Sequence, residues 1–258
     1  MRLSPTIKTI ILFGALTGLL GVIGYLISGT GGMLIFLFFG IFSNIFAYLF
    51  GDRIALMMSG AQEVIREQMP EIFQLTEDLA QKMNIKVPRI YISPNMQPNA
   101  FATGKGPNSS SICLTQGLVQ MLTKEEIQGV IAHELSHIRN RDVLIATVAA
   151  IIAGVISSIA QIGIFFGGND RDRSPVVDLL MLILAPIAAT LIQLSISRTR
   201  EYEADATAAK YTRNPQGLAN ALIKIDQAAR QIPLEQGNPA MSSLYIENPF
   251  RGQGVIEL

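Results

Sequence analysis

Two uncharged hydrophobic stretches near the start of the chain constrain its fold more than any other feature. Residues 9–28 and 33–50 contain no charged side chain, and the segment 29–32 between them holds three glycines. Each stretch can cross a hydrocarbon core of about 30 Å as a helix that rises about 1.5 Å per residue. A secretory signal peptide would explain the first stretch alone, but not a second that follows at once. We therefore expect residues 1–50 to form a transmembrane hairpin.

A second hydrophobic pair occupies residues 143–168 and 175–197. Hydrophobic residues make up 49% of the chain, charged residues only 16%, and the mean hydropathy is +0.37, which favours membrane spans over the core of a soluble protein. Asp178 and Pro186 weaken the fourth stretch, so two spans plus a buried hydrophobic hairpin remain the alternative. The sequence predicts a mainly helical integral membrane protein with about four transmembrane helices.

Basic residues near the ends of these stretches predict how the chain lies in the membrane. They are Arg2, Lys8, Arg53, Arg139, Arg141, Arg198 and Arg200. The turn 29–32 carries no charge, whereas the loop 169–174 holds two arginines and two aspartates and is ambiguous. Basic residues favour the cytoplasmic side. We expect a multi-pass protein of the cell inner (plasma) membrane, with its termini and polar body in the cytoplasm and the lipid bilayer as a partner.

Charge balance and cysteine content exclude some classes of function. The 20 lysines and arginines equal the 20 aspartates and glutamates, so no charge excess points to nucleic acid as a partner. The single cysteine, Cys113, excludes a disulfide within the chain and a cysteine-rich metal site. We interpret Cys113 as a small buried residue in a strand.

The polar segment between the hydrophobic pairs combines helix and strand patterns. Residues 54–84 read as one helix, with a break or kink at Pro70. Residues 87–92 and 111–115 have the composition of short strands, which predicts a small β-sheet.

The stretch between those strands could be a short exposed strand or a connecting loop. As a strand, its free edge would accept a peptide through backbone hydrogen bonds, which read peptide shape with little demand on sequence. The candidate substrate-binding residues are Asn99, Ala100, Phe101, Ala102 and Thr103.

The sequence HELSH, residues 133–137, lies in a predicted helix over 124–141 that Thr123 and Glu126 open with the spacing of a capping box. His133 and His137 are the only histidines in the chain. Four residues apart on a helix, they project from one face and can reach a single zinc ion. Glu134 is placed to take a proton from metal-bound water, as metal-assisted hydrolysis requires. We predict one Zn²⁺ per chain, with Glu134 as the catalytic base.

A catalytic zinc site needs a third protein ligand, and no further histidine exists to supply it. The segment 200–205, REYEAD, resumes polar sequence after the fourth hydrophobic stretch and has a helical pattern. Glu201 would complete a site of two histidines and one glutamate, and Asp205 could orient a ligand imidazole. From these residues alone, Glu203 and Asp205 remain alternatives to Glu201.

At HELSH and REYEAD the chain resembles the HtpX-type membrane metalloproteases, which are related to the CAAX prenyl protease. The resemblance extends to the hydrophobic pairs, to NAFATG at 99–104 and to HELSHIRNRD at 133–142. It implies a zincin-like α+β catalytic domain, Glu201 as third ligand, Asp205 behind the ligands and 99–104 as the edge that aligns substrate. It also implies stress-linked quality control of misfolded or damaged membrane proteins.

The resemblance divides the chain into four parts. Residues 1–50 form the first hairpin, 51–142 the first part of the peptidase domain, 143–197 the second hairpin and 198–258 the second part of the domain. Relatives continue past a segment like SLYIENPF with a His-Pro stretch, so we expect this chain to be short at its end. A structural zinc site that holds unfolded chains, and processing of prenylated peptides, are the alternative functions. Nothing in the residues sets an oligomeric state.

Overall fold

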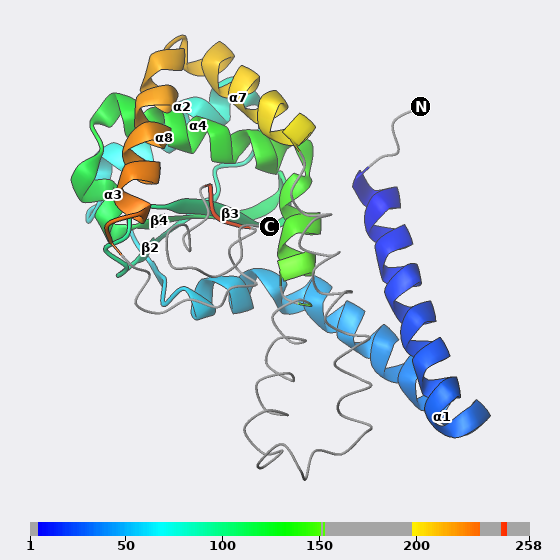
Figure 1. The fold of residues 1–258 in the computed structure, drawn as a ribbon. Coiled ribbons are helices and arrows are strands. Elements are labelled where there is room, and N and C mark those ends of the chain that lie inside the picture. The colour runs from blue at the N-terminus through cyan, green and yellow to red at the C-terminus, as the bar shows by residue number, and fades with distance from the viewer. Residues whose placement is uncertain (1–4, 151, 153–197, 233–243, 247–258) are drawn as a thin grey trace.

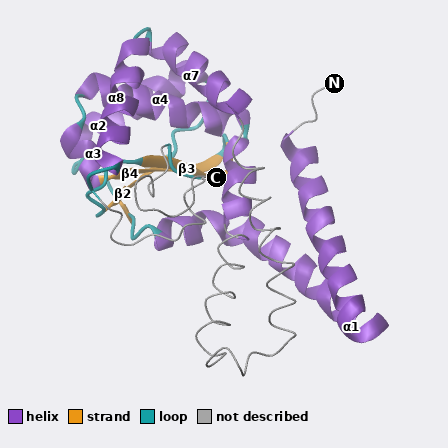
Figure 2. Cartoon of the chain, in the orientation of Figure 1, coloured by secondary structure: helices purple, strands orange, loops and turns teal. Residues whose placement is uncertain are grey.

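The structure is a computed structural model that describes residues 5–150, 152, 198–232 and 244–246. Its polar body is a small mixed sheet with helices against both faces, and a long helical arm projects from one side (Figures 1 and 2). The arm comes from the start of the chain. It therefore corresponds to the first hydrophobic pair of the sequence.

Helix α1, Pro5–Met58, reverses direction at Ser28 and Gly29, whose backbone angles are not helical. Gly29 has φ 58°, a conformation that glycine adopts without strain. The two halves pack closely, since a Cβ on Gly32 would lie 2.2 Å from the carbonyl oxygen of Gly24. The expected pair of helices joined by a glycine turn is therefore confirmed.

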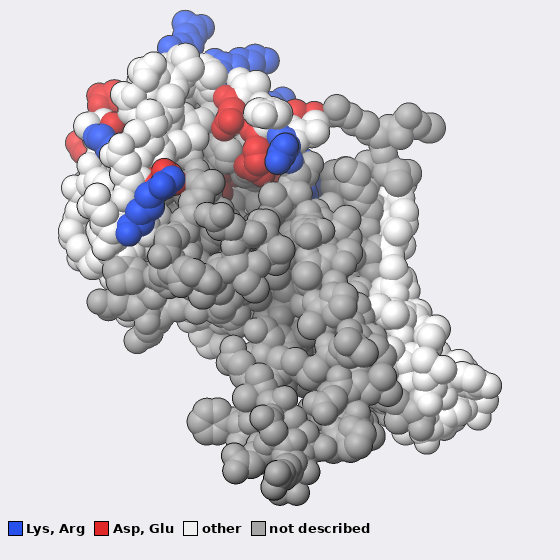
Figure 3. All heavy atoms as spheres, in the orientation of Figure 1, with Lys and Arg blue, Asp and Glu red and all other residues white. Residues whose placement is uncertain are grey.

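One described helix is long and apolar enough to cross a membrane. It covers Ser28–Met58, with a mean hydropathy of 2.2, whereas the apolar helix Phe13–Leu26 is shorter. Large side chains such as Phe38, Phe42 and Leu26 are exposed along the arm, and the arm shows no charged side chain on the face seen in Figure 3. Exposing so many apolar side chains to water is unfavourable, whereas contact with lipid is favourable. Of the second pair, residues 143–150 are helical, and nearly all the rest lies outside the described residues.

The expected single helix over 54–84 is wrong. Helix α1 ends at Met58, a short strand β1 covers Gln62–Glu63, and helix α2 covers Pro70–Met83. Gly60, at φ 63°, turns the chain after α1. Pro70 is the first residue of α2, where its ring fits and its missing N–H costs nothing. The break expected at Pro70 is therefore present, but the proline starts a new helix instead of kinking a continuous one.

The other three strands are β2 Arg89–Ser93, β3 Ala100–Gly106 and β4 Ser109–Thr115. Of these, β2 and β4 match the two expected from the sequence, and β3 covers the stretch left open between a strand and a loop. The strand order is β1-β2-β4-β3, with β2 parallel and β3 antiparallel to β4. Strand β3 therefore lies at an edge, so 99–104 is mainly an edge strand and not a loop.

Helix α4, Lys124–Asn140, lies across one face of the sheet, covered in turn by α7, Arg198–Thr212, and α8, Pro215–Ala229 (Figure 1). A short helix α3, Gln116–Met121, follows β4. The main core lies between these helices and the sheet. A smaller cluster covers the opposite face, where the end of α1 packs on Phe101 and Cys113. Burial raises the pKa of Cys113 to about 12, as expected for a structural thiol.

Candidate metal centre

Helix α4 places two imidazoles on its face toward α7. The Nε2 atoms of His133 and His137 lie 3.0 Å apart, and their side chains are 4% and 15% exposed. The capping box that the sequence predicts is present, with Thr123 and Glu126 each bonding the other's backbone. Because this cap stabilises a regular helix, the four-residue spacing places His133 and His137 on the same face of α4.

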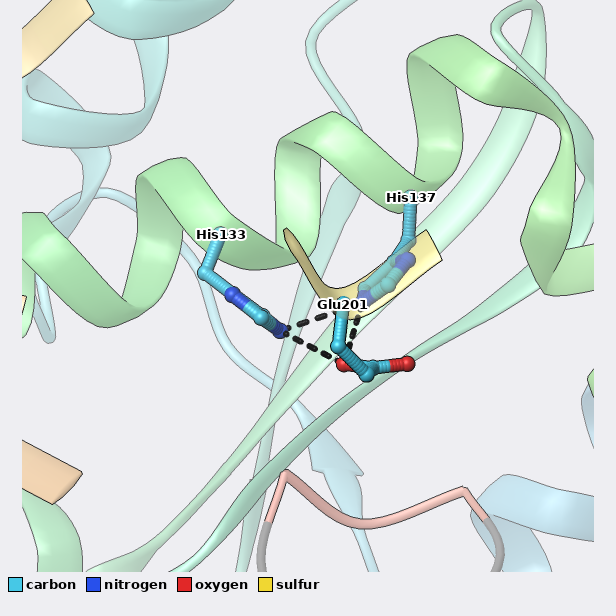
Figure 4. A group of neighbouring side chains, drawn as sticks. All are labelled: His133, His137 and Glu201. Carbon is cyan, nitrogen blue, oxygen red and sulfur yellow. Dashed lines mark hydrogen bonds and ion pairs between the residues drawn. The ribbon is translucent and has the colours of Figure 1, made fainter. Parts of the chain in front are cut away.

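Helix α7 brings Glu201 to the same point. Its Oε2 lies 3.4 Å from the Nε2 of His133 and 3.4 Å from the Nε2 of His137 (Figure 4). Glu203, two residues along the helix, has an exposed side chain. Among the described residues, His133, His137 and Glu201 form the one group able to share an ion. The geometry therefore selects Glu201 from the three carboxylates that the sequence left open.

The spacing of these three atoms suits a tetrahedral ion. With metal–ligand bonds of about 2.0–2.2 Å, tetrahedral ligand atoms lie about 3.3–3.6 Å apart. Glu201 Oε2 lies 3.4 Å from each imidazole Nε2, within this range, and the two Nε2 atoms lie 3.0 Å apart, slightly below it. Two nitrogens and one carboxylate oxygen are the donor set of catalytic zinc, and three protein ligands leave a fourth position for water or substrate. The residues present fit a zinc ion.

Each histidine is held from behind by a carboxylate. Asp205 Oδ1 lies 3.0 Å from the Nδ1 of His133, and Asp142 Oδ2 lies 3.4 Å from the Nδ1 of His137. Such pairing fixes the ring orientation and leaves Nε2 available to bind a metal ion. Asp205 was expected from the sequence, whereas Asp142 was missed. Its position five residues after His137, at the end of HELSHIRNRD, was the available signal.

The carboxylates also change how the imidazoles bind protons. Burial alone would lower the pKa of both histidines, but hydrogen bonds to Asp205 and Glu201 raise that of His133, and those to Asp142 and Glu201 raise that of His137 to about 10. Burial would likewise raise the pKa of Glu201, yet the two imidazoles hold it well below its usual range. The cluster is thus an acceptor for positive charge, whether a proton or a metal ion.

Glu134 belongs to α4, and its side chain reaches the backbone of Ala102 on the edge strand β3. Its side chain is almost fully buried, and this burial raises its pKa, partly offset by the neighbouring histidines and by a backbone hydrogen bond from Ala102. A carboxylate with a raised pKa is a better proton acceptor. Glu134 therefore lies beside the three-atom cluster without belonging to it.

The candidate substrate-binding residues lie at the start of β3, next to the Glu134 carboxylate. The side chains of all five, Asn99, Ala100, Phe101, Ala102 and Thr103, are buried. Thr103 Oγ1 lies 2.9 Å from Thr147 Oγ1, and the N–H of Asn99 donates to Thr115 Oγ1. An exposed strand is therefore only half right: β3 lies at an edge of the sheet, but these five residues are buried, backbone included.

The fold and the site define a class of protein. A helix that carries HExxH, a glutamate from a later helix and a sheet edge beside them form the site of a metallopeptidase. The profile of Peptidase family M48 matches residues 66–245. The chain belongs to this family, and the resemblance to HtpX-type proteases is confirmed.

Three known proteins illustrate the relationship. The chain is 48% identical to a protein named Protease HtpX homolog from Pyrococcus furiosus, covering 100% of this chain and 91% of that one. It is 47% identical to the protein of the same name from Aquifex aeolicus, covering 93% and 83%. The crystal structure of S. mikatae Ste24p matches 93% of this chain with a TM-score of 0.50 and 22% identity, and the match spans 59% of Ste24p. That likeness concerns the fold.

Proposed function

We propose that the protein is a membrane-bound, zinc-dependent endopeptidase. His133, His137 and Glu201 hold one Zn²⁺ per chain, and Glu134 is the catalytic base. The observation that carries the proposal is the convergence of Glu201 on both imidazoles at 3.4 Å, from a helix that lies beyond the second hydrophobic pair. A distant carboxylate placed in this way, beside a buried glutamate, is hard to explain by the needs of folding alone.

The chain's own residues account for the proton movements. Zinc bound there would supply Lewis-acid polarisation of the scissile carbonyl and would acidify a water molecule. Glu134 would take a proton from the attacking water and deliver it to the leaving nitrogen. Its burial, which raises its pKa, suits both steps because the group must accept a proton and then donate it. Asp142 and Asp205 keep the imidazoles oriented throughout.

Substrates bind by adding a strand to the edge of β3. Backbone pairing there can select an extended chain without selecting its sequence, because the side chains of Asn99–Thr103 are buried and offer few specific contacts. Folded proteins rarely present such a segment, whereas misfolded ones do. This supports a role in quality control, with unfolded or damaged membrane proteins as substrates, as the HtpX-type resemblance implies.

The membrane location rests on α1 and on the second hydrophobic pair. Residues 1–50 and 143–197 are the two hairpins, while 51–142 and 198–258 together form the peptidase domain on the cytoplasmic side. The site is divided between the two parts of that domain. The second hairpin therefore connects the HELSH helix to the helix of Glu201.

Cleavage assays on the full chain in detergent test the proposal. We expect an unfolded model protein to be cleaved at internal bonds, with activity lost to a chelator and restored by stoichiometric zinc. Zinc bound at one per chain without cleavage would instead support a structural site that holds unfolded chains. Cleavage confined to a prenylated peptide, with unfolded proteins left intact, would point to the prenyl-processing alternative.

A further inference from the structure

A short segment from near the end of the chain lies against the edge of β3. The backbone N–H of Ile246 donates a hydrogen bond of 3.0 Å to the carbonyl oxygen of Ala100. Residues 244–246 are drawn in red beside β3 in Figure 1. They use one of the backbone groups that an added peptide strand would need.

Side chains on both sides of the strand anchor this segment. The ring of Tyr245 packs edge-to-face on Phe101, with centroids 5.3 Å apart, and Leu244 is buried in the same cluster beneath the sheet. Ile246 packs against the main core on the opposite face. Tyr245 and Ile246 therefore contact opposite faces of the sheet. Residues 244–246 are thus held against β3 by a backbone hydrogen bond and by packed side chains.

The pairing of β3 with β4 shows which backbone groups face outward. Asn99 bonds Thr115 on β4, and the register pairs Phe101 with Cys113. By alternation, the backbone groups of Ala100, Ala102 and Gly104 point away from β4. The Ala102 N–H reaches Glu134, so the reacting bond of a paired peptide lies near Ala102. Ala100 is two residues from that position, about 7 Å along the strand.

We propose that residues 244–246 form a stop on the β3 edge that sets how far a substrate pairs on the Ala100 side of the site. This inference rests on the proposed peptidase function. Toward Ala100, a peptide gains strand pairing for about two residues and then meets Ile246. In the other direction β3 continues through Gly104 to Gly106, where, among the described residues, no backbone partner beyond β4 is hydrogen-bonded to the strand, although both glycines are buried. The peptide site is therefore short on one side and longer on the other.

Peptides anchored at the zinc ion test this asymmetry without catalysis. Two series of fluorescent peptides carry a hydroxamate at one end, which fixes their register on the ion, and grow one residue at a time from either the amino or the carboxyl side. Dissociation constants are measured by anisotropy on the zinc-loaded full chain in detergent. We expect affinity to stop rising after about two residues in one series and to continue rising, about threefold to tenfold per paired residue, in the other.

Ile246→Pro removes the N–H that occupies Ala100, because proline has none. We expect the shorter series to gain affinity beyond its former limit in this variant, while Ile246→Val, which keeps the N–H, behaves like the parent. Tyr245→Ala loosens the anchor on Phe101 and is expected to change the profile in the same direction. If Ile246→Pro has a lowered melting temperature, the affinity profile of Tyr245→Ala is used instead to test whether residues 244–246 form the stop.

Equal gains beyond two residues in both series would overturn the stop. So would a profile that neither Ile246→Pro nor Tyr245→Ala changes. If no hydroxamate peptide binds the zinc-loaded protein at all, the proposed peptidase site itself fails and the stop falls with it. The two failures are therefore distinguishable.

Discussion

Asp142 and Arg200 lie 4.0 Å apart, Oδ1 to Nη1, at the two ends of the second hydrophobic pair. The other oxygen of Asp142 contacts His137, and Arg200 precedes Glu201 directly in α7. One ion pair therefore joins the point where the chain leaves the HELSH helix to the point where it returns. A site divided by a long insertion needs such a tie, because both halves must meet to within a few tenths of an ångström.

Asp142→Asn is expected to weaken zinc binding by about 10-fold to 100-fold, the usual cost of losing a carboxylate behind a ligand histidine. Competition with a fluorescent zinc chelator measures this affinity. Asp226→Asn, which changes an ion pair with Arg230 on α8, is the matched control and should leave the affinity unchanged. Equal affinity in all three proteins would show that Asp142 does not orient His137.

Glu201→Gln is expected to reduce bound zinc well below one per chain, since the amide oxygen is a much poorer ligand than a carboxylate. Glu203→Gln removes the same charge two residues away on an exposed side chain and should retain one zinc. Metal content by atomic emission, on protein that elutes normally in size exclusion, is the measurement. Loss in Glu203→Gln with retention in Glu201→Gln would reverse the assignment.

Glu126 is expected to make stability depend on pH. Burial opposes its charge, but hydrogen bonds from Lys224 and from the Thr123 backbone hold its pKa below its ordinary 4.5. A carboxyl group whose pKa is lower in the folded than in the unfolded state stabilises the fold at pH values above its unfolded-state pKa. That stabilisation is lost as the pH falls through its folded-state pKa. Glu126→Gln should cost about 1–3 kcal/mol near neutral pH.

Melting temperatures across pH check this. The difference between Glu126→Gln and the parent should shrink as pH falls below about 4.5. Glu125→Gln, on the exposed neighbour, should show a much smaller difference. A difference that persists unchanged into acid would mean that the charge of Glu126 is not the cause.

Gly129→Ala is expected to destabilise the protein, although alanine is the better helix former by about 1 kcal/mol. Helix α8 crosses α4 here, and a Cβ at 129 would lie 2.7 Å from the backbone nitrogen of Leu218. Forcing the helices apart costs about 1–3 kcal/mol. Thermal unfolding in detergent measures the change, with Gln128→Ala on the same helix as the control. A raised melting temperature for Gly129→Ala would contradict the close crossing.

Local rules explain which parts of the fold were predictable from sequence. The HELSH helix has its own cap, and the strands have β-branched and aromatic runs, so neighbours along the chain determine them. Residues 54–84 failed because apolar periodicity continues through Gly60 and past Pro70, while the real breaks depend on a left-handed turn and on proline as a helix start. The same Gly129 that weakens helix propensity is explained only by α8, which sequence periodicity does not place.

The candidate site was predictable to the extent that its chemistry is local. His133, Glu134 and His137 share one helix, so their spacing alone predicts their geometry. Choosing Glu201 over its neighbours required the packing of α7 on α4, or the family resemblance. The contact of Asp142 depends on the left-handed turn at Arg141, so its place in HELSHIRNRD is only a partial signal. The contact of Ile246 depends on the edge of a sheet, which no residue pattern along the chain encodes.

Comparing Glu134→Gln with the parent, at equal and independently measured zinc content, tests the central claim most directly. Both proteins are incubated in detergent with an unfolded model substrate, and peptide-bond cleavage is followed by mass spectrometry. The glutamine keeps the shape but cannot accept the proton, so we expect zinc to stay at one per chain and the rate to fall by about 100-fold or more. Cleavage at the parental rate by zinc-loaded Glu134→Gln would contradict the role of Glu134 and with it the proposed mechanism.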